Sequence, residues 1–145
     1  SLSERAATTR QVRRRIRWVP EAAVRAMHAE LVAEHGGRAG IRDEVLLSSA
    51  LARPRNRRVY GASTTLFELA AGYGVGIIRN HPFIDGNKRL ALMVMYVFLE
   101  INGYCLAAPE VDAAGMMLRL AASELAERDL ARWLRANSHV SRQGG

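Results

Sequence analysis

Apolar side chains recur at intervals of three and four residues in five segments of the chain and fill a sixth almost completely. This spacing predicts helices over residues 20–35, 43–53, 65–78, 90–101, 109–121 and 127–136. Thr65 and Glu68 form a capping-box pattern at the start of the third segment. No repeat or domain-sized linker interrupts the series, so we expect one all-α domain.

The segment 90–101 has no polar face, and such a helix must be covered by others on most sides. We therefore expect a single-domain bundle of about six helices around one buried central helix. Residues 16–19 alternate apolar and polar side chains, and residues 104–107 are extended in character, so these two stretches are expected to form a short β pair. Gly72, Gly74 and Gly76 predict close packing of another helix against the third one.

Composition changes along the chain and suggests where the domain begins and ends. Residues 1–15 are polar, small and basic and are expected to form a flexible extension, the domain spans residues 16–138, and residues 139–145 form a tail. Pro54 is expected to stop the second helix. Residues 53–64 are then the longest expected loop inside the domain, and loops of this length often carry function.

The bulk composition favours a folded cytoplasmic protein. Among 145 residues, 49% are hydrophobic and 24% charged, which excludes disorder of the whole chain. The single cysteine, Cys105, excludes an internal disulfide and fits a reducing compartment. No segment has the length and character of a membrane span or a signal peptide. We therefore expect a cytoplasmic location and no membrane partner.

The formal net charge is +7, and much of the excess lies in two arginine clusters, at positions 10–17 and 53–58. Such clusters can bind nucleic acid, acidic protein surfaces or nucleotide phosphates, or can simply be solvated surface. The sequence leaves these alternatives open.

The most concentrated polar chemistry lies just before the segment 90–101. Gly86 can adopt a positive φ, so that successive backbone N–H groups converge on an oxyanion. Asn87 can offer a cap or a carboxamide donor, and Lys88 and Arg89 add a point charge and a planar fork. Since a helix N-terminus itself favours anions, these four residues predict a phosphate site.

The residues just before them supply the remaining chemistry. His81 could take a proton from an attacking hydroxyl, and Asp85 offers one carboxylate of the kind Mg²⁺ uses together with substrate phosphates. Phe83 is expected to insert into the core and fix the loop, while Pro82 restricts the backbone of His81. His28 has no partner ligand at a metal-like spacing, so we assign it no role in a site.

The stretch 81–89 is similar to the Fic-family signature, in which His, Pro, Phe, an acidic residue, Gly, Asn and Arg stand at these spacings. Lys88 stands where most Fic enzymes carry a second Gly, and that form resembles the Doc (death on curing) toxin branch. Further Doc-like stretches lie at residues 40–44, 52–54, 67–70 and 102–103. The resemblance covers residues 18–137 and leaves out the basic extension.

The resemblance implies a Fic/Doc helical fold with an ATP–Mg²⁺ site. His81 would be the general base, Asp85 the metal carboxylate, Gly86 and Asn87 the anion nest, and Lys88 with Arg89 the phosphate cations. Doc toxins transfer the γ-phosphoryl group of ATP to a threonine of elongation factor Tu and stop translation. Fic enzymes with the second Gly mostly transfer AMP to a hydroxyl.

The resemblance also implies a partner antitoxin whose disordered tail folds against the toxin and inhibits it in trans. The predicted basic loop would border the site and dock the target or the antitoxin tail, through Arg53, Arg55, Arg57, Arg58 and Tyr60.

Three functions therefore stand in order. The first is a Doc-type protein kinase toxin, the second a protein nucleotidyltransferase, and the third a catalytically silent basic binding domain. Direct nucleic-acid binding is not expected, because a silent scaffold has no need of His81, Asp85 and Asn87 together.

Overall fold

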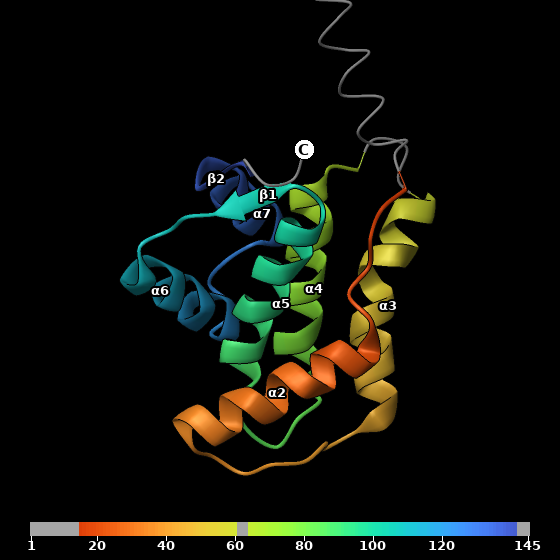
Figure 1. Cartoon of the computed structure of the whole chain (residues 1–145), viewed down its shortest axis with the longest axis vertical. Helices are drawn as coiled ribbons and strands as arrows, with labels where there is room; N and C mark the ends of the chain where they lie inside the picture. The colour runs from red at the N-terminus through yellow and green to blue at the C-terminus, as the bar shows by residue number, and fades with distance from the viewer. Residues whose placement is uncertain (1–14, 61–63, 142–145) are drawn as a thin grey trace, which may run out of the picture.

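A computed structural model describes residues 15–60 and 64–141 as a helical bundle with a short antiparallel sheet (Figure 1). The helices of the described part are α2 (Glu21–His35), α3 (Glu44–Tyr60), α4 (Leu66–Asn80), α5 (Asn87–Ile101), α6 (Glu110–Ala121) and α7 (Glu127–Ala136). The strands are β1 (Tyr104–Leu106) and β2 (Ser138–Val140). The all-α prediction with about six helices and a β pair is confirmed. No helix among the described residues has both the length and the apolar run that a membrane crossing requires.

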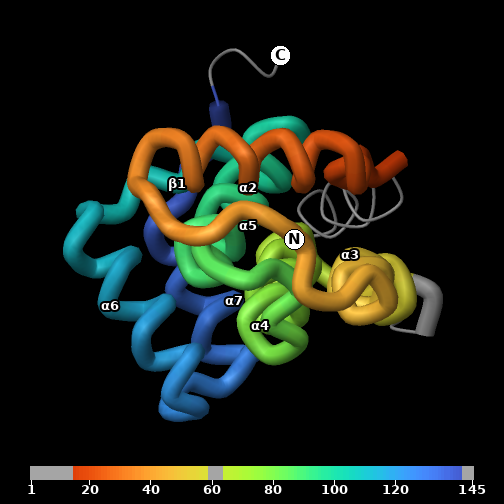
Figure 2. Tube along the Cα trace, turned by 90° about the horizontal axis from the view of Figure 1, so that it is seen from below, coloured from red at the N-terminus to blue at the C-terminus, as the bar shows by residue number. Residues whose placement is uncertain are grey.

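Helices α4 and α5 share the centre of the bundle. They lie side by side between α3 on one flank and α6 with α7 on the other, while α2 crosses their lower ends (Figures 1 and 2). Every residue of α4 from 69 to 77 is buried, whereas α5 leaves Tyr96 42% exposed. The centre is therefore wider than the single helix expected over residues 90–101, because apolar composition alone does not show which face has a neighbour.

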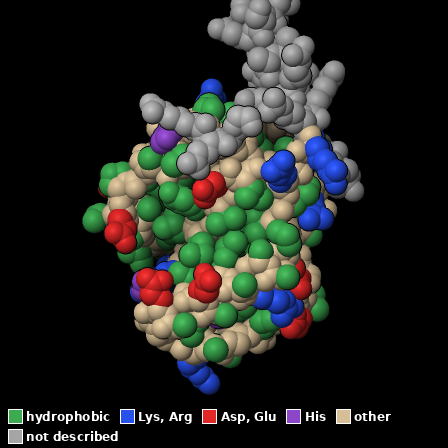
Figure 3. Space-filling model, viewed as in Figure 1, with side chains coloured by type: hydrophobic (Ala, Val, Ile, Leu, Met, Phe, Trp, Pro, Cys, Tyr) green, Lys and Arg blue, Asp and Glu red, His purple; other side chains and the backbone are tan. Residues whose placement is uncertain are grey.

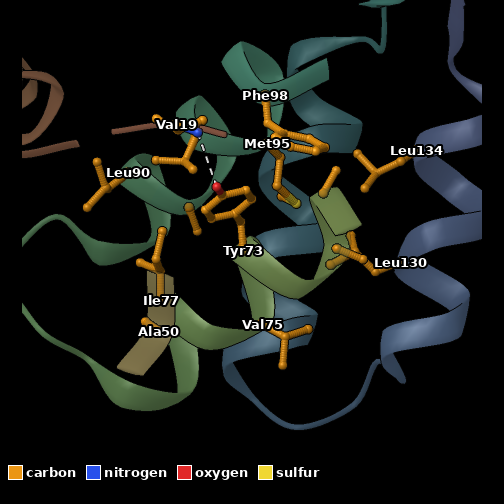
Figure 4. Packing of buried hydrophobic residues seen from close by; sticks show 14 of the residues in the cluster. Val19, Ala50, Tyr73, Val75, Ile77, Leu90, Met95, Phe98, Leu130 and Leu134 are labelled. Atoms are coloured by element: carbon orange, nitrogen blue, oxygen red, sulfur yellow. Dashed lines mark hydrogen bonds between the residues drawn. The ribbon is translucent and has the colours of Figure 1, made fainter. Parts of the chain in front are cut away.

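Three glycines let α4 approach its neighbours closely, as their spacing predicted. A Cβ on Gly76 would lie 2.9 Å from the carbonyl oxygen of Ala50 in α3, and one on Gly74 would lie 2.5 Å from the sulfur of Met95 in α5. On Gly72 it would lie 3.4 Å from the ring of Pro54. The three contacts bring α3 and α5 against α4, and Figure 4 shows the resulting core around Tyr73.

We expect Gly76→Ala to lower the free energy of unfolding by about 1–3 kcal/mol, because the new methyl group meets backbone atoms of α3 that cannot move alone. The matched control is Gly115→Ala in α6, where nothing lies within 4 Å of the added Cβ. That change should stabilise by about 0.5–1 kcal/mol through helix propensity. Urea unfolding of both variants measures the difference, and equal effects would contradict the tight α3–α4 contact.

The expected loop over residues 53–64 is wrong, since α3 continues through Pro54 to Tyr60. Pro54 is buried against Gly72, and its missing N–H leaves the carbonyl of Ala50 to the close contact with Gly76. Further along, Arg57 pairs with Glu127 of α7 at 2.5 Å and with Glu68 of α4 at 3.5 Å. Packing and ion pairs to two other helices therefore outweigh the cost of the proline.

The expected pairing of residues 16–19 with 104–107 is also wrong. β1 pairs with β2, with Cys105 opposite His139, so the domain boundary expected after residue 138 falls inside a strand. Most of the predicted basic extension, residues 1–14, lies outside the described part of the chain.

Residues 16–19 instead run alongside α4 and α5 without joining a sheet. The side chain of Asn102 binds both backbone groups of Arg17, at 3.0 and 2.9 Å, and Val19 donates its N–H to the Tyr73 hydroxyl at 3.2 Å (Figure 4). Burial of that hydroxyl raises the pKa of Tyr73.

Candidate active site

The loop 81–86 joins α4 to α5 and begins at a residue with unusual backbone geometry. His81 has φ 49° and ψ 56°, a left-handed conformation that turns the chain out of α4, and its N–H still bonds to the carbonyl of Ile77. Arg42 holds this turn with its guanidinium group, which donates to the carbonyls of His81 at 2.7 Å and Asn80 at 2.8 Å. The exposed His81 side chain therefore stands on a fixed backbone.

The segment between α2 and α3 forms one edge of the loop (Figure 2). The carbonyl of Pro82 accepts the N–H groups of Arg42 and Asp43, at 2.7 and 3.1 Å. Ile84 donates its N–H to the carbonyl of Gly40 at 3.1 Å. Asp43 also accepts the N–H of Leu46 at 3.0 Å and so caps α3, as predicted.

Phe83 and Asn87 fix the inner side of the loop. The Phe83 side chain is 2% exposed and lies in the core, as expected. The buried Asn87 carboxamide accepts the N–H of Phe83 at 3.1 Å and donates to its carbonyl at 2.9 Å. Since both ends of this carboxamide are occupied, Asn87 can offer a phosphate only its backbone N–H.

Asp85 is held from two sides while its carboxylate remains exposed. The Oδ2 atom accepts the N–H of Arg38 at 2.9 Å, and the backbone carbonyl accepts a bond from His28 Nε2 at 2.7 Å. His28 is 3% exposed, and its ring stacks on that of Phe83 with centroids 3.8 Å apart. The sequence analysis missed this histidine, although its helical spacing from the buried Val24 and Leu31 was the available signal.

The start of α5 differs from the starts of the other described helices. Gly86 caps it with φ 80° and ψ 14°, without a side-chain hydrogen bond, and its first turn holds no acidic residue. Acidic residues do stand in the first turn of each of the others, namely Glu21, Glu44, Glu68, Glu110 with Asp112, and Glu127 with Asp129. Lys88 and Arg89 take that place in α5 and add to the positive end of the helix dipole.

Within the described residues, the side chains of His81, Lys88 and Arg89 have neither a hydrogen-bond nor an ion-pair partner, and all three are exposed. The backbone N–H groups of the first turn of α5 lack a side-chain cap as well. The loop thus offers an imidazole, one carboxylate and several anion donors around a single helix start. This combination can bind a phosphate and accept a proton beside it.

The predicted docking arginines occupy the other end of α3. Arg53 and Arg57 pair with Glu127, each at 2.5 Å, and the Arg55 guanidinium lies 5.4 Å from the Trp18 ring centroid. Arg58 also lies on this part of α3, and the side chain of Tyr60 is outside what the structure describes.

Two surface cavities flank α3, and residues 81–89 line neither. A basic cavity of about 800 Å³ is lined by Arg15, Ile16, Arg17, Trp18, Arg55 and Arg58. Figure 3 shows Lys and Arg side chains gathered over this part of α3. A smaller cavity of about 280 Å³ lies between α3 and α4 and includes Asn80, the neighbour of His81. The predicted docking role of the arginines stays a prediction.

Comparison with known proteins agrees with this geometry. The profile of the Fic/DOC family matches residues 18–99, which include α2, α3, α4, the loop and most of α5. The chain belongs to the Fic/DOC family. The matched range also holds the groups that anchor the loop, from His28 and the segment 38–43 to Asn87.

Two relatives are named after the Doc branch of the Fic/DOC family. The chain is 42% identical over 97 residues to the protein "Toxin Doc" of Mycolicibacterium smegmatis, a match that covers 65% of this chain and 71% of that protein. It is 37% identical over 78 residues to "Protein kinase doc" of Escherichia phage P1, covering 54% of this chain and 62% of the phage protein. The resemblance drawn from residues 81–89 is therefore confirmed at the level of the family.

Proposed function

We propose that the chain is a Doc-type toxin that transfers the γ-phosphoryl group of ATP to a serine or threonine hydroxyl of a protein. The observation that carries the proposal is the start of α5, where uncapped N–H groups, Lys88 and Arg89 face solvent beside His81. The names of the two relatives, one a toxin and one a protein kinase, support the same reading. The target expected from the family resemblance is a threonine of elongation factor Tu.

In this reaction His81 accepts the proton of the target hydroxyl as its oxygen forms a bond to the γ-phosphorus. The bond between that phosphorus and the bridging oxygen breaks, and ADP leaves with the electron pair. The backbone N–H groups of Gly86, Asn87 and Lys88 and the two cations stabilise the charge on the phosphates. Positioning and charge stabilisation are most of what phosphoryl transfer needs.

The residues present fit a magnesium ion that is held mainly by the nucleotide. Among the described residues there is no group of three His, Cys, Asp or Glu side chains able to hold a metal alone. Asp85 offers one exposed carboxylate, already oriented by the N–H of Arg38. Mg²⁺ is commonly bound by one or two carboxylates together with substrate phosphates and waters, so Asp85 would hold it and neutralise phosphate charge.

We also propose a cognate antitoxin with a disordered tail that folds on this chain, since the relatives' names place the family branch among toxins. The basic cavity beside α3 has the charge to receive acidic residues of such a tail. Because Arg53 and Arg57 already pair with Glu127, Arg55 is the better candidate for this contact.

The type of transfer is tested by incubating the purified chain with a host-cell extract and ATP labelled at either the α or the γ position. We expect one protein to acquire label from the γ position only, and mass spectrometry should place one phosphate on a Ser or Thr. Purified elongation factor Tu serves as the candidate acceptor. Label from the α position would replace the kinase by a nucleotidyltransferase, and no label from either would favour a silent binding domain.

A further inference from the structure

A buried histidine contacts the active-site loop from outside the motif. His28 lies on α2, 57 residues before Asp85, yet its Nε2 atom is 2.7 Å from the Asp85 carbonyl oxygen. We propose that His28 is a positioning residue, which turns the peptide between Asp85 and Gly86 so that the Gly86 N–H faces the phosphate. The proposal rests on the function proposed above and deepens it.

The orientation follows from the planarity of the peptide bond. No described peptide bond is cis, and in a trans peptide the C=O and the N–H point in opposite directions. The Asp85 carbonyl points inward to the buried His28, so the N–H of Gly86 points away from α2. That N–H leads the donors at the start of α5, where the anion is expected.

This peptide needs an external restraint because a glycine follows it. Glycine adopts positive and negative φ with similar ease, so the plane between Asp85 and Gly86 can rotate at low cost. Gly86 has φ 80°, and a Cβ built on it would lie 3.6 Å from His28 Nε2, so the imidazole ring lies directly against this backbone. A flipped peptide would aim its carbonyl oxygen at the phosphate and repel it.

The ring is itself held in one orientation. It stacks on Phe83 with an interplanar angle of 19°, and Phe83 is tied to Asn87 through both backbone groups. A carbonyl oxygen can only accept, so Nε2 of His28 must carry the hydrogen, which both the neutral Nε2–H form and the imidazolium satisfy. The hydrogen bond and the stacking are separate contributions, and two substitutions separate them.

His28→Phe keeps an aromatic ring on Phe83 but removes the donor, whereas His28→Gln removes the ring but retains an amide donor of similar reach. If His28 acts through its hydrogen bond, the Phe variant should weaken binding of Mg·ATP by about tenfold, and the Gln variant by about threefold or less. If His28 merely fills the core, the order of the two variants should reverse. Isothermal titration with Mg·ATP measures the affinities, and thermal unfolding reports whether each variant is folded.

The orientation of the Gly86 N–H bond is measured separately, without nucleotide, through its residual dipolar coupling in the full chain. We expect the coupling to match between wild type and His28→Gln and to change in His28→Phe. Equal couplings in all three folded proteins, or the reversed order of affinities, would overturn the positioning role. If wild type binds no Mg·ATP, the proposed function fails, while the coupling still decides whether His28 orients this peptide.

Discussion

The His81→Ala variant is expected to transfer phosphoryl groups about 10²–10⁴-fold more slowly than wild type, because it removes the group that accepts the hydroxyl proton. Its free energy of unfolding should change by about 1 kcal/mol or less. The side chain is exposed and has no bonded partner within the described residues, while the backbone bonds to Ile77 and Arg42 remain. Initial rates with γ-labelled ATP and urea unfolding measure the two quantities.

The left-handed backbone of His81 requires a second variant as control. Alanine is less favourable than asparagine at φ 49°, so His81→Asn keeps the turn without supplying a comparable base. Both variants should lose transfer to a similar extent, and expression of either should not arrest growth. Toxicity equal to that of wild type in both would remove the general base and favour the silent binding domain.

Local signals in the sequence were sufficient for most helix ends. Pro109 precedes α6, Gly36 ends α2, and α7 covers the predicted residues 127–136. The Thr65 hydroxyl accepts the N–H of Glu68 at 3.1 Å, as the capping pattern predicted. These features depend on neighbours within one turn, which a sequence displays directly.

Where distant contacts decide, the same reasoning failed. Pro54 is a strong local stop, yet α3 passes through it because Gly72 and Gly76 make room and Glu127 neutralises the arginines beyond. The apolar character of residues 104–107 predicted a strand but could not name its partner, which lies at residues 138–140. Alternation shows which face is apolar and says nothing about which strand it meets.

The chemistry of the site was predictable in type but not in direction. The residue types in 81–89 indicated an anion site with a base, and the loop does place Gly86 in a left-handed conformation at a helix start. Nothing in that stretch shows that Arg42 holds the turn at His81 or that His28 lies beneath Asp85. Such anchors come from sequence positions 39 and 57 residues away, so only the fold reveals them.

The inward direction of Asn87 has the larger consequence. We expect Asn87→Ala to lower the free energy of unfolding by about 2–5 kcal/mol, because it leaves the buried N–H and C=O of Phe83 without partners. The loop should also lose its shape, so Mg·ATP binding should fall even where the variant remains folded. Urea unfolding and calorimetric titration below the unfolding midpoint measure the two effects.

Asn137→Ala is the matched control, since the same side chain there makes one hydrogen bond, to the carbonyl of Trp133 at 2.9 Å, at the end of α7. It should cost about 0.5–1.5 kcal/mol and leave nucleotide binding unchanged. An Asn87→Ala variant that is as stable as this control but binds no nucleotide would mean that the carboxamide turns outward to the phosphate. Loss of stability together with binding would instead place Asn87 among the groups that shape the loop, with its backbone N–H as its contact to the anion.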